Sequence, residues 1–349
     1  MRCIPHYPIV LPVKIAIVGE APGEEEELTG IPFIGKAGHE LNAMLSEAGI
    51  IRNDCYITNV FLDRPPGNDL SKWCTSKKEV GKGYSAPALM KSKYLRVEHL
   101  HERDRLWKEL NDLNPNLVIA LGNTACWALL DSCGITSLRG VIQKSPHIKA
   151  KVLPTYHPAA VLRQWDLRAI AVCDLMKAAK EAEYPEVKSP HFEIYIEPSL
   201  DDVLNWETQC AESTYLTLDI ETIPGKGQIT CVGIGIDGNK ALVIPFVEKK
   251  EAGSYWKTQE EEVLAWKTIK RICNLPQPKV LQNGLYDMQW LWKLVGIPLR
   301  NATYDTMILH HSMQPELPKG LEFLASVYTN FPSWKQMRPR GNQTSKLEE

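Results

Sequence analysis

The chain has 349 residues, of which 44% are hydrophobic and 23% charged, and its formal net charge is −2. This length suits two domains better than one, and the composition is that of an ordinary globular protein. No segment approaches the roughly 18 uninterrupted apolar residues of a membrane span, and the opening residues lack a secretory pattern, which argues against a membrane protein and for the cytoplasm.

The cysteine count indicates the redox state of the thiols, and the charge indicates how the chain could bind nucleic acid. The nine cysteines form an odd, scattered set, which predicts reduced thiols rather than a disulfide framework. A net charge near zero gives no overall attraction for nucleic acid, so such a contact depends on a local basic patch. One candidate patch, with aromatic residues interleaved, contains Arg64, Lys72, Lys77, Lys78, Lys82, Lys91, Lys93 and Arg96. A solvated, irregular insertion is the alternative interpretation.

The first half of the chain alternates predicted strands with predicted helices. Apolar or β-rich runs predict strands at 14–19, 55–60, 117–122 and 151–155, and helical spacing predicts helices at 37–48, 124–130 and 173–183. This alternation predicts an α/β layered sheet. In such a sheet the ligand site lies beyond the carboxyl ends of the strands.

A second unit is expected after the proline-containing stretch 184–190, which we interpret as a linker. Strands are predicted at 215–221, 230–236, 241–245 and 279–282, with a hairpin turn at 237–239, and helices at 260–273 and 286–295. The predicted domains are therefore 1–183 and 191–335. Residues 336–349 are polar and are predicted to be a disordered tail.

The motifs of the first domain follow its predicted strands. Residues 19–23 read GEAPG directly after the first strand, and residues 30–38 read GIPFIGKAG. Asn59-Val60, the RPPG string at 64–67 and the TYHPAAVLR string at 155–163 come later. Taken in this order, they resemble the motifs of the uracil-DNA glycosylase superfamily, closest to its iron–sulfur-containing family-four enzymes. The resemblance covers roughly residues 13–183.

This resemblance implies a three-layer α/β/α fold with a parallel central sheet, and hydrolysis of the N-glycosidic bond of uracil in DNA by base flipping. Such an enzyme extrudes its base into a pocket. Phe33 matches the stacking residue, Asn59 the residue that reads the uracil edge, and Ala21 is expected beside the base. His157 matches the donor that stabilises the departing uracil anion.

Further residues are assigned by the same resemblance. Glu20 and Glu26 match positions associated with placing water and countering the sugar cation. Val161, Leu162 and Arg163 are expected to contact DNA. Each residue alone has a simpler explanation, since a Phe after Pro is usually core, an Asn ending a strand is usually a cap, and His-Pro pairs are common. Their joint order favours the functional interpretation.

Two departures from the family pattern concern its cofactor and one motif residue. The iron–sulfur enzymes carry four cysteines, whereas here only Cys3 stands near the first pair, Asp63 precedes the RPPG string where a cysteine is expected, and Cys74 lacks partners. We therefore predict no iron–sulfur cluster and no cofactor for this domain. The loop 69–99 would then pack through its own side chains, Trp73, Tyr84, Leu89 and Tyr94. Ala159 replaces the family's usual serine.

The second domain carries a pattern of acidic residues. Asp219 and Glu221 are expected on one face of a strand, with Asp287 as the third acid, and such carboxylates hold Mg²⁺ or Mn²⁺ in nucleases. With the string YDTM at 304–307, this pattern resembles the proofreading 3′→5′ exonuclease domain of family A DNA polymerases over roughly residues 191–335. A ribonuclease H-like fold with a mixed sheet is implied. Asp305 is expected to be structural, as a helix N-cap.

The second site is incomplete by this comparison. The family's last motif supplies a fourth acid, and no Asp follows Asp305. We therefore expect little exonuclease activity from this chain alone, and interpret it as the front portion of a longer, phage-type polymerase. A truncated gene, a split gene and an expression fragment are alternatives. The expected partners are DNA and the remainder of a DNA polymerase, in the cytoplasm of a bacterial or phage-infected host cell.

Three functions follow from these patterns. The leading hypothesis is a uracil-DNA glycosylase tied to replication. The second is a non-catalytic module that binds uracil or holds template strand near a polymerase. The third is a 3′→5′ exonuclease whose missing ligand comes from further chain.

Overall fold

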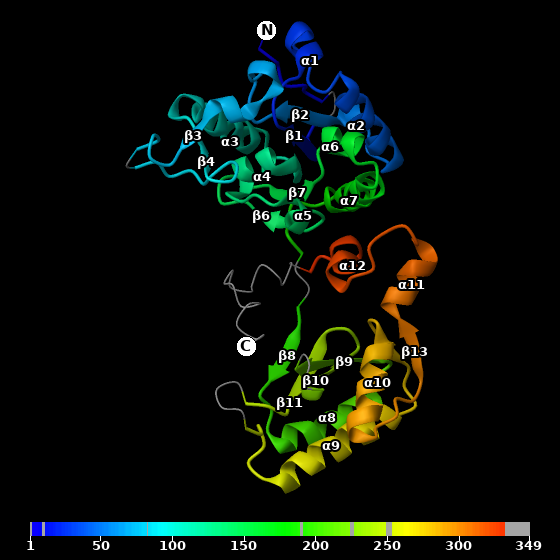
Figure 1. Ribbon diagram of the computed structural model, residues 1–349. Helices are drawn as coiled ribbons and strands as arrows, with labels where there is room; N and C mark the ends of the chain where they lie inside the picture. The colour runs from blue at the N-terminus through cyan, green and yellow to red at the C-terminus, as the bar shows by residue number, and fades with distance from the viewer. Residues whose placement is uncertain are drawn as a thin grey trace. The chain divides into compact units, whose positions relative to one another are not determined.

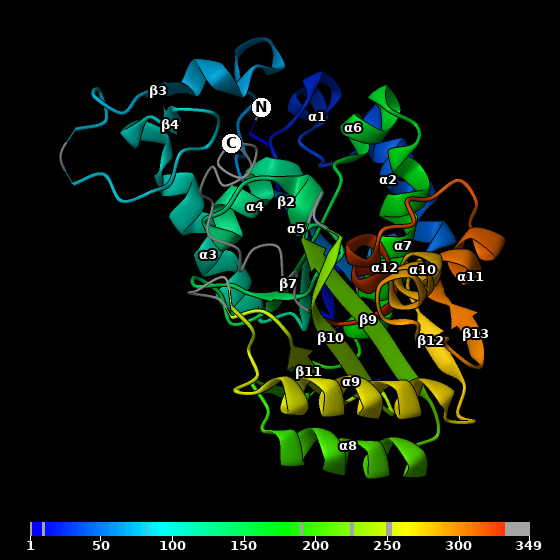
Figure 2. The same cartoon turned by 60° about the horizontal axis from the view of Figure 1, so that its bottom comes forward.

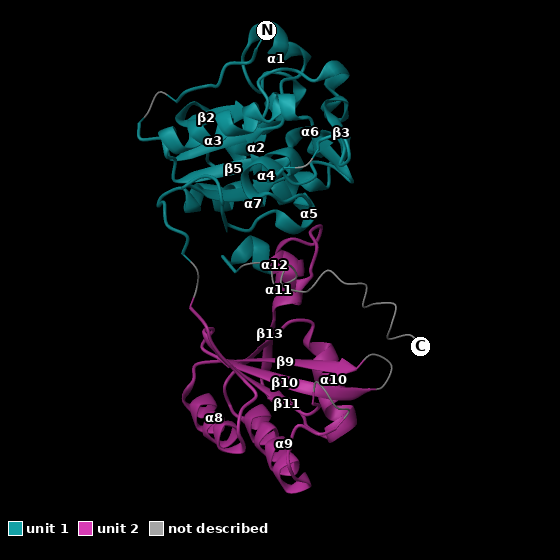
Figure 3. Ribbon diagram, turned by 90° about the vertical axis from the view of Figure 1, so that its left-hand side faces the viewer, with its two compact units in different colours: residues 1–189, 325–349 teal, residues 190–324 magenta. Residues whose placement is uncertain are grey.

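The computed structural model describes residues 2–8, 11–81, 83–188, 191–223, 227–248 and 253–331. The chain divides into two compact units, with residues 1–189 and 325–349 in unit 1 and residues 190–324 in unit 2 (Figure 3). The division falls within the stretch interpreted as a linker, whereas residues 325–331 group with unit 1 rather than with the second unit. The expected tail, 336–349, lies outside the described residues. No helix within the described ranges is both long and apolar enough to cross a membrane.

Unit 1 is built on a sheet with strand order β2-β1-β5-β7-β6. Its strands are β1 (Ile15–Gly19), β2 (Cys55–Asn59), β5 (Leu117–Leu121), β6 (Gln143–Lys144) and β7 (Lys151–Thr155). Its helices are α1 (Glu24–Thr29), α2 (Lys36–Glu47), α3 (His101–Leu113), α4 (Gly122–Leu130), α5 (Ile135–Leu138), α6 (Pro158–Arg163) and α7 (Leu167–Glu181). All pairs in the sheet are parallel except β6 with β7.

Helices cover both faces of this sheet. Every residue of β1, β2, β5 and β7 is buried, as expected for parallel strands with a layer on each side. Alternate residues such as Val18, Ala120 and Val152 join a core with α3 and α4, and α7 packs on β5 and β7. Figures 1 and 2 show α3 and α4 on one face and α2, α6 and α7 on the other. The predicted three-layer α/β/α fold is confirmed.

The strand register brings the predicted motifs to one edge. Gly19 at the end of β1 lies opposite Asn59 at the end of β2, and Leu121 of β5 lies opposite Thr155 of β7. The loops that follow these four strands therefore meet at the carboxyl edge of the sheet.

The segment between β2 and α3 is more ordered than the sequence suggests. It contains a two-stranded antiparallel sheet, β3 (Cys74–Ser76) with β4 (Lys93–Leu95). Leu89 and Leu95 are buried in the unit 1 core, and Trp73 and Tyr84 pack against it. Tyr94 contacts Tyr84 edge-on at a ring-centroid distance of 5.8 Å. The predicted packing of this segment through its own aromatic and leucine side chains is confirmed.

Unit 2 has a mixed six-stranded sheet with order β13-β12-β9-β10-β11-β8. Its elements are β8 (Glu193–Ile196), α8 (Leu200–Glu212), β9 (Leu216–Ile223), β10 (Gln228–Ile236), β11 (Lys240–Pro245), α9 (Gln259–Asn274), β12 (Lys279–Leu281), α10 (Gly284–Val295), β13 (Ala302–Asp305) and α11 (Thr306–Met313). A further helix, α12 (Leu321–Tyr328), contains the boundary between the units. The predicted meander β9-β10-β11 is antiparallel. Strand β12 pairs in parallel with β9 and with β13, and β8 pairs in parallel with β11.

Helices α8 and α9 lie side by side (Figure 2), and Arg271 of α9 forms an ion pair with Glu207 of α8. Helix α10 packs on β9. The predicted mixed sheet is confirmed, and the edge strands β8 and β13 are additions to the prediction. Both strands are only four residues long and largely exposed, so neither is marked by the buried apolar run on which the strand predictions depend.

Candidate active site

A cavity of about 800 Å³ opens at the carboxyl edge of the unit 1 sheet. The predicted residues that line it are Glu20, Ala21, Glu26, Phe33, Asn59, His157 and Arg163. These residues come from five separate stretches of the chain, and the fold brings them to one space. Residues that line it without having been predicted include Leu28, Lys36, Asn68, Asn123, Ile135 and Tyr156.

Sequence signals exist for three of these additional residues. Lys36 and Tyr156 lie inside the GIPFIGKAG and TYHPAAVLR strings, and Asn68 directly follows the RPPG string. Asn123 and Ile135 come from α4 and α5, outside any motif. The Asn123 Oδ1 accepts hydrogen bonds from the backbone N–H groups of Gly134 and Ile135, at 2.9 and 2.8 Å, and so fixes that side of the cavity.

Two glycines allow Phe33 to reach the cavity. A Cβ on Gly19 would overlap the ring of Phe33 and the Oδ1 of Asn59, and a Cβ on Gly38 would overlap the Phe33 carbonyl oxygen. Phe33 itself is buried and has φ of 54°, in the left-handed region that side chains rarely adopt. A bulky residue held there indicates a functional constraint on the position of its ring.

Asn59 ends β2 with its side-chain amide at the cavity. The residue is 3% exposed, and its backbone oxygen accepts a hydrogen bond from Arg105 Nη2 at 2.8 Å. Among the residues that the structure describes, none forms a hydrogen bond with the Asn59 side-chain amide. A buried amide with both its donor and its acceptor available is suited to a ligand that offers the complementary pair.

His157 is the N-cap of α6, and its Nδ1 accepts a hydrogen bond from the backbone N–H of Ala159 at 3.2 Å. Because this bond uses the Nδ1 lone pair, the neutral ring carries its proton on Nε2. Burial and, secondarily, the charge of Arg163 lower the pKa of His157 to about 4. The ring lies 5.8 Å from that of Phe33, centroid to centroid. His157 is therefore a neutral N–H donor at pH 7.

The two predicted acidic residues have different surroundings. A carboxylate oxygen of Glu20 accepts a hydrogen bond from the Thr124 hydroxyl, in the first turn of α4. Glu20 is only partly buried and lines the cavity, so its carboxylate is accessible to a ligand or to water.

Glu26 is buried and holds the loop that contains Phe33. Its Oε2 accepts a hydrogen bond from the backbone N–H of Gly23 at 3.0 Å. Its Oε1 accepts two more from the N–H groups of Ile34 and Gly35, at 3.2 and 3.1 Å. Three backbone donors converge on one carboxylate, so Glu26 joins the start of α1 to the start of α2. These contacts indicate a positioning residue.

The three residues of α6 that were expected to contact DNA differ in their exposure. Val161 is fully buried, which argues against a direct contact of its side chain with DNA. Leu162 is 46% exposed, and Arg163 is exposed and lines the cavity. Successive residues of a helix point about 100° apart, so neighbours in one motif face different surroundings. Trp165, which was not predicted, is 62% exposed just beyond α6.

The cysteines of unit 1 do not fit a four-thiolate cluster. Cys3 is buried, and its backbone N–H donates to the oxygen of Leu62, beside Asp63. Burial raises the pKa of the Cys3 thiol to about 11. The Cys74 thiol is buried and donates to the Leu70 oxygen at 3.5 Å. Over the described ranges, no group of three or more His, Cys, Asp and Glu side chains is placed to hold a metal ion.

The acidic residues of unit 2 lie near one another. Asp219 and Glu221 share the exposed face of β9, as predicted, while the residues between and before them are buried. Asp287, in the first turn of α10, is 3% exposed, and its Oδ1 accepts a hydrogen bond from the backbone N–H of Ile220 at 2.9 Å. Burial is the main cause that raises the pKa of Asp287 to about 6, with the charge of Asp219 adding to it.

These three acidic residues do not form a metal-ready cluster in the described part of the chain, where no group of three suitable side chains is found. Asp305 has the structural role that was predicted. It is the N-cap of α11, and its Oδ1 accepts a hydrogen bond from the backbone N–H of Met307 at 2.9 Å. Its Oδ2 also accepts from the N–H of Gly284 at 2.7 Å, which joins α10 to α11.

Fold and cavity together define unit 1 as an α/β protein with a polar ligand site at the carboxyl edge of a parallel sheet. The family model of the uracil DNA glycosylase superfamily matches residues 7–182. The type-4 uracil-DNA glycosylase of Thermotoga maritima is 36% identical over 172 residues, covering 48% of this chain and 77% of that protein. That of Archaeoglobus fulgidus is 34% identical over 171 residues, covering 47% and 74%. The chain belongs to the uracil-DNA glycosylase superfamily.

One relative extends beyond unit 1. A DNA polymerase of Bacillus phage SP01 is 22% identical over 327 residues, covering 85% of this chain and 32% of that protein. The match thus spans about a third of that polymerase and, at 85% of this chain, extends into unit 2. A solved structure, Escherichia coli RNase D, an exoribonuclease involved in structured RNA processing, aligns with a TM-score of 0.31 and 16% identity, covering 45% of this chain and 40% of that chain.

Proposed function

We propose that unit 1 hydrolyses the N-glycosidic bond of uracil in DNA. The observation that carries this proposal is the convergence of Phe33, Asn59 and His157 on one cavity. A base inside a duplex is out of reach of such a cavity, so the target nucleotide must be extruded from the stack. The base then stacks on the Phe33 ring, and the Asn59 amide pairs with its edge.

Breaking the N-glycosidic bond places negative charge on the uracil, and His157 donates a hydrogen bond to the charged base. Its Nε2–H is a neutral donor, held in orientation by the Ala159 N–H on the opposite side of the ring. A preorganised donor of this kind stabilises the departing anion by a hydrogen bond. The C1′–N1 electron pair leaves with the base, water adds its oxygen to C1′, and the water proton goes to solvent or to the base. The products are uracil and an abasic site.

Glu20 and Glu26 have different roles in this proposal. Glu20 is accessible in the cavity, where its carboxylate can orient the attacking water and offset the positive charge on the sugar. Glu26 acts through the loop that it holds, so it positions Phe33. None of these steps needs a metal ion, and we propose that excision requires no iron–sulfur cluster and persists in the presence of a chelator.

The test uses a labelled single-uracil oligonucleotide, with abasic sites cleaved after incubation. Cleavage is expected for the wild-type chain and strong loss for His157→Ala. Ala159→Ser, which alters the same motif but leaves the Ala159 backbone N–H in place, is the matched control and should stay active. If the wild-type chain binds uracil-containing DNA with preference over thymine-containing DNA and releases no uracil, the second hypothesis, a non-catalytic uracil-binding module, replaces this proposal.

For unit 2 we propose a 3′→5′ exonuclease-like role within a DNA polymerase, with further polymerase chain and DNA as partners in the cytoplasm of a bacterial or phage-infected cell. The match to the phage polymerase supports this placement. Six large apolar side chains on α10, β13 and α11 are also exposed, namely Leu285, Trp292, Tyr304, Ile308, Leu309 and Met313.

The unit 2 proposal is tested with end-labelled single-stranded DNA and Mg²⁺ or Mn²⁺. We propose that Asp219, Glu221 and Asp287 hold the metal only once a further acidic ligand completes the site. The chain alone should therefore shorten DNA slowly or not at all. Adding further polymerase chain should raise the rate, and Asp219→Ala should abolish that gain. A rate that the added chain leaves unchanged would contradict this arrangement.

A further inference from the structure

Unit 1 carries a basic arm, which we define as residues 72–96. It holds seven lysines and arginines and a single acidic residue, Glu79, in a chain with net charge −2. Figures 1 and 2 show the described residues just after β3 projecting away from the body of the unit. Six of its basic side chains are described, and all are exposed: Lys72, Lys77, Lys78, Lys91, Lys93 and Arg96.

None of these six side chains takes part in an ion pair with another residue that the structure describes. The nearby carboxylate of Asp69 accepts a hydrogen bond from the backbone N–H of Ser71 at 3.0 Å. Hydrogen bonds from Ser71 are the main cause that lowers the pKa of Asp69, and the charges of Lys72 and Lys93 contribute less. Exposed like charges repel one another, so concentrating them in one segment is unfavourable for the isolated protein. That cost is offset when a polyanion binds.

The arm is anchored to the body. Cys74 pairs with Leu95 and Ser76 with Lys93 in the β3–β4 ladder. The Tyr84 hydroxyl donates to the Leu95 oxygen at 2.8 Å, and Trp127 Nε1–H donates to the Pro87 oxygen at 2.9 Å. The backbone is therefore held at several points along the arm, so less conformational entropy is lost when its basic side chains bind.

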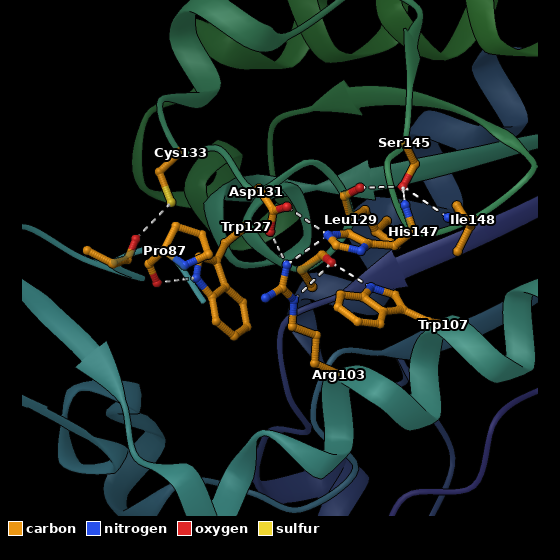
Figure 4. A network of polar contacts seen from close by, with 12 residues as sticks. Pro87, Arg103, Trp107, Trp127, Leu129, Asp131, Cys133, Ser145, His147 and Ile148 are labelled. Carbon is orange, nitrogen blue, oxygen red and sulfur yellow. Dashed lines mark hydrogen bonds and ion pairs between the residues drawn. The ribbon is translucent and has the colours of Figure 1, made fainter. Parts of the chain in front are cut away.

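Trp127, which holds Pro87 of the arm, belongs to a network of polar and aromatic contacts shown in Figure 4. The Arg103 guanidinium lies between two indole rings, 4.5 Å from that of Trp107 and 4.8 Å from that of Trp127. It also pairs with Asp131, which accepts from His147 Nε2 at 2.8 Å. These contacts fix the last turn of α4 and the indole that holds the arm.

The same helix connects the arm with the cavity. Trp127, which holds Pro87, lies on α4, one turn after Thr124, which donates to Glu20. The Cys133 thiol, close to the lining residue Ile135, contacts the Leu89 oxygen at 3.5 Å. The arm begins four residues after Asn68, which also lines the cavity. The arm is therefore connected to the cavity lining both near Asn68 and near Ile135.

We propose that the basic arm binds the phosphodiester backbone of the DNA that flanks the extruded nucleotide. This inference rests on the proposed function for the location of the target base, whereas the phosphate contact itself stands on charge, exposure and anchoring. Phosphate contacts set position and affinity without reading sequence. The arm should therefore act on DNA of any sequence, with or without uracil.

The first experiment measures binding of a uracil-free, fluorescently labelled 30-base-pair duplex by anisotropy between 50 and 300 mM salt. The variant Lys77→Ala/Lys78→Ala/Lys91→Ala removes three exposed charges from the arm. Each lost phosphate contact lowers the slope of log K against log salt by about 0.9, so the slope should fall by roughly 2.7. If the affinity extrapolated to 1 M salt is unchanged, this slope difference corresponds to a drop of roughly 500-fold at about 0.1 M salt.

The matched control is Lys108→Ala/Lys144→Ala/Lys149→Ala, which removes the same charge from exposed positions of unit 1 outside the arm and the cavity lining. It should change the slope by less than one unit. A charge-reversed variant, Lys77→Glu/Lys78→Glu, should weaken binding further than the alanine variant. Unchanged thermal unfolding of all variants establishes that they fold. An arm variant that binds DNA as the control does would overturn the proposal.

Single-turnover excision separates this inference from the proposed function. If uracil excision occurs, the arm variant should show a higher half-saturating enzyme concentration with an unchanged maximal rate, because the arm does not touch the reacting atoms. If no excision occurs but duplex binding depends on the arm, the glycosylase proposal fails and the arm proposal stands. If excision occurs and binding is independent of the arm, only the arm proposal fails.

Discussion

The Nδ1 of His157 accepts a hydrogen bond from the backbone N–H of Ala159, 3.2 Å away. This bond assigns the proton of the neutral ring to Nε2. The donor available to a ligand therefore comes from the way α6 begins, with the histidine side chain capping the helix that follows it. Orientation and protonation of the candidate catalytic group are set by one local interaction.

Replacing His157 by alanine should lower the single-turnover excision rate by about 100- to 1,000-fold, because one preorganised donor to the departing anion is lost. Binding of uracil-containing DNA should weaken far less. Gel-based excision assays and anisotropy with the same oligonucleotide measure both. A loss in binding as large as the loss in rate would assign His157 to recognition rather than to chemistry.

The excision rate should show no titration near pH 6.5. The pKa of His157 is lowered to about 4, so the neutral donor is fully populated from about pH 5 upward. The rate should decline only as the pH falls toward 4. A rate–pH profile from 4.5 to 8.5 tests this, and a midpoint near 6.5 that disappears in His157→Ala would contradict it.

The same depressed pKa affects stability. The unfolded state has a histidine pKa near 6.5 and so binds more protons than the folded state between about pH 4 and 6.5. His157 therefore makes the unfolding free energy fall as the pH decreases through that window. Urea unfolding at pH 7 and pH 5 should show a smaller pH effect in His157→Phe than in the wild type. Equal effects in both proteins would argue against the assignment.

Gly19→Ala should nearly abolish excision. The added Cβ overlaps both the Phe33 ring and the Asn59 Oδ1, so the two residues cannot keep their places together. The unfolding free energy should also fall, by about 1–3 kcal/mol, as for other overpacked sites. Gly320→Ala is the control, because its Cβ has no neighbour within 4 Å. Full activity of Gly19→Ala would disprove the proposed geometry.

Glu20→Gln and Glu26→Gln should separate chemistry from positioning. Glu26→Gln keeps only one acceptor oxygen for three backbone donors, so at least one buried N–H is left without a partner and stability should fall by about 1–3 kcal/mol. Glu20→Gln should leave stability nearly unchanged and lower the maximal rate. Thermal unfolding and single-turnover assays distinguish them, and similar losses in both properties for both variants would refute the division.

Much of this protein could be predicted from its sequence, because its signals are local. The uninterrupted apolar runs of β1 and β5 predict buried parallel strands, and both are buried along their whole length. Asp305 was expected to cap a helix and does so, since an N-cap depends on residues next to it in the chain. The order of the motifs was enough to place the chain in its family.

Other features depend on packing between distant segments and were decided only by the tertiary structure. Val161 and Leu162 are adjacent, yet one is buried and the other exposed, because the surroundings of α6 determine which side chain is covered. Glu26 has its role because the N–H groups of residues 23, 34 and 35 converge on it. The basic residues of the arm are visible in the sequence, but the Trp127 and Tyr84 contacts that fix them are long-range interactions that no local pattern encodes.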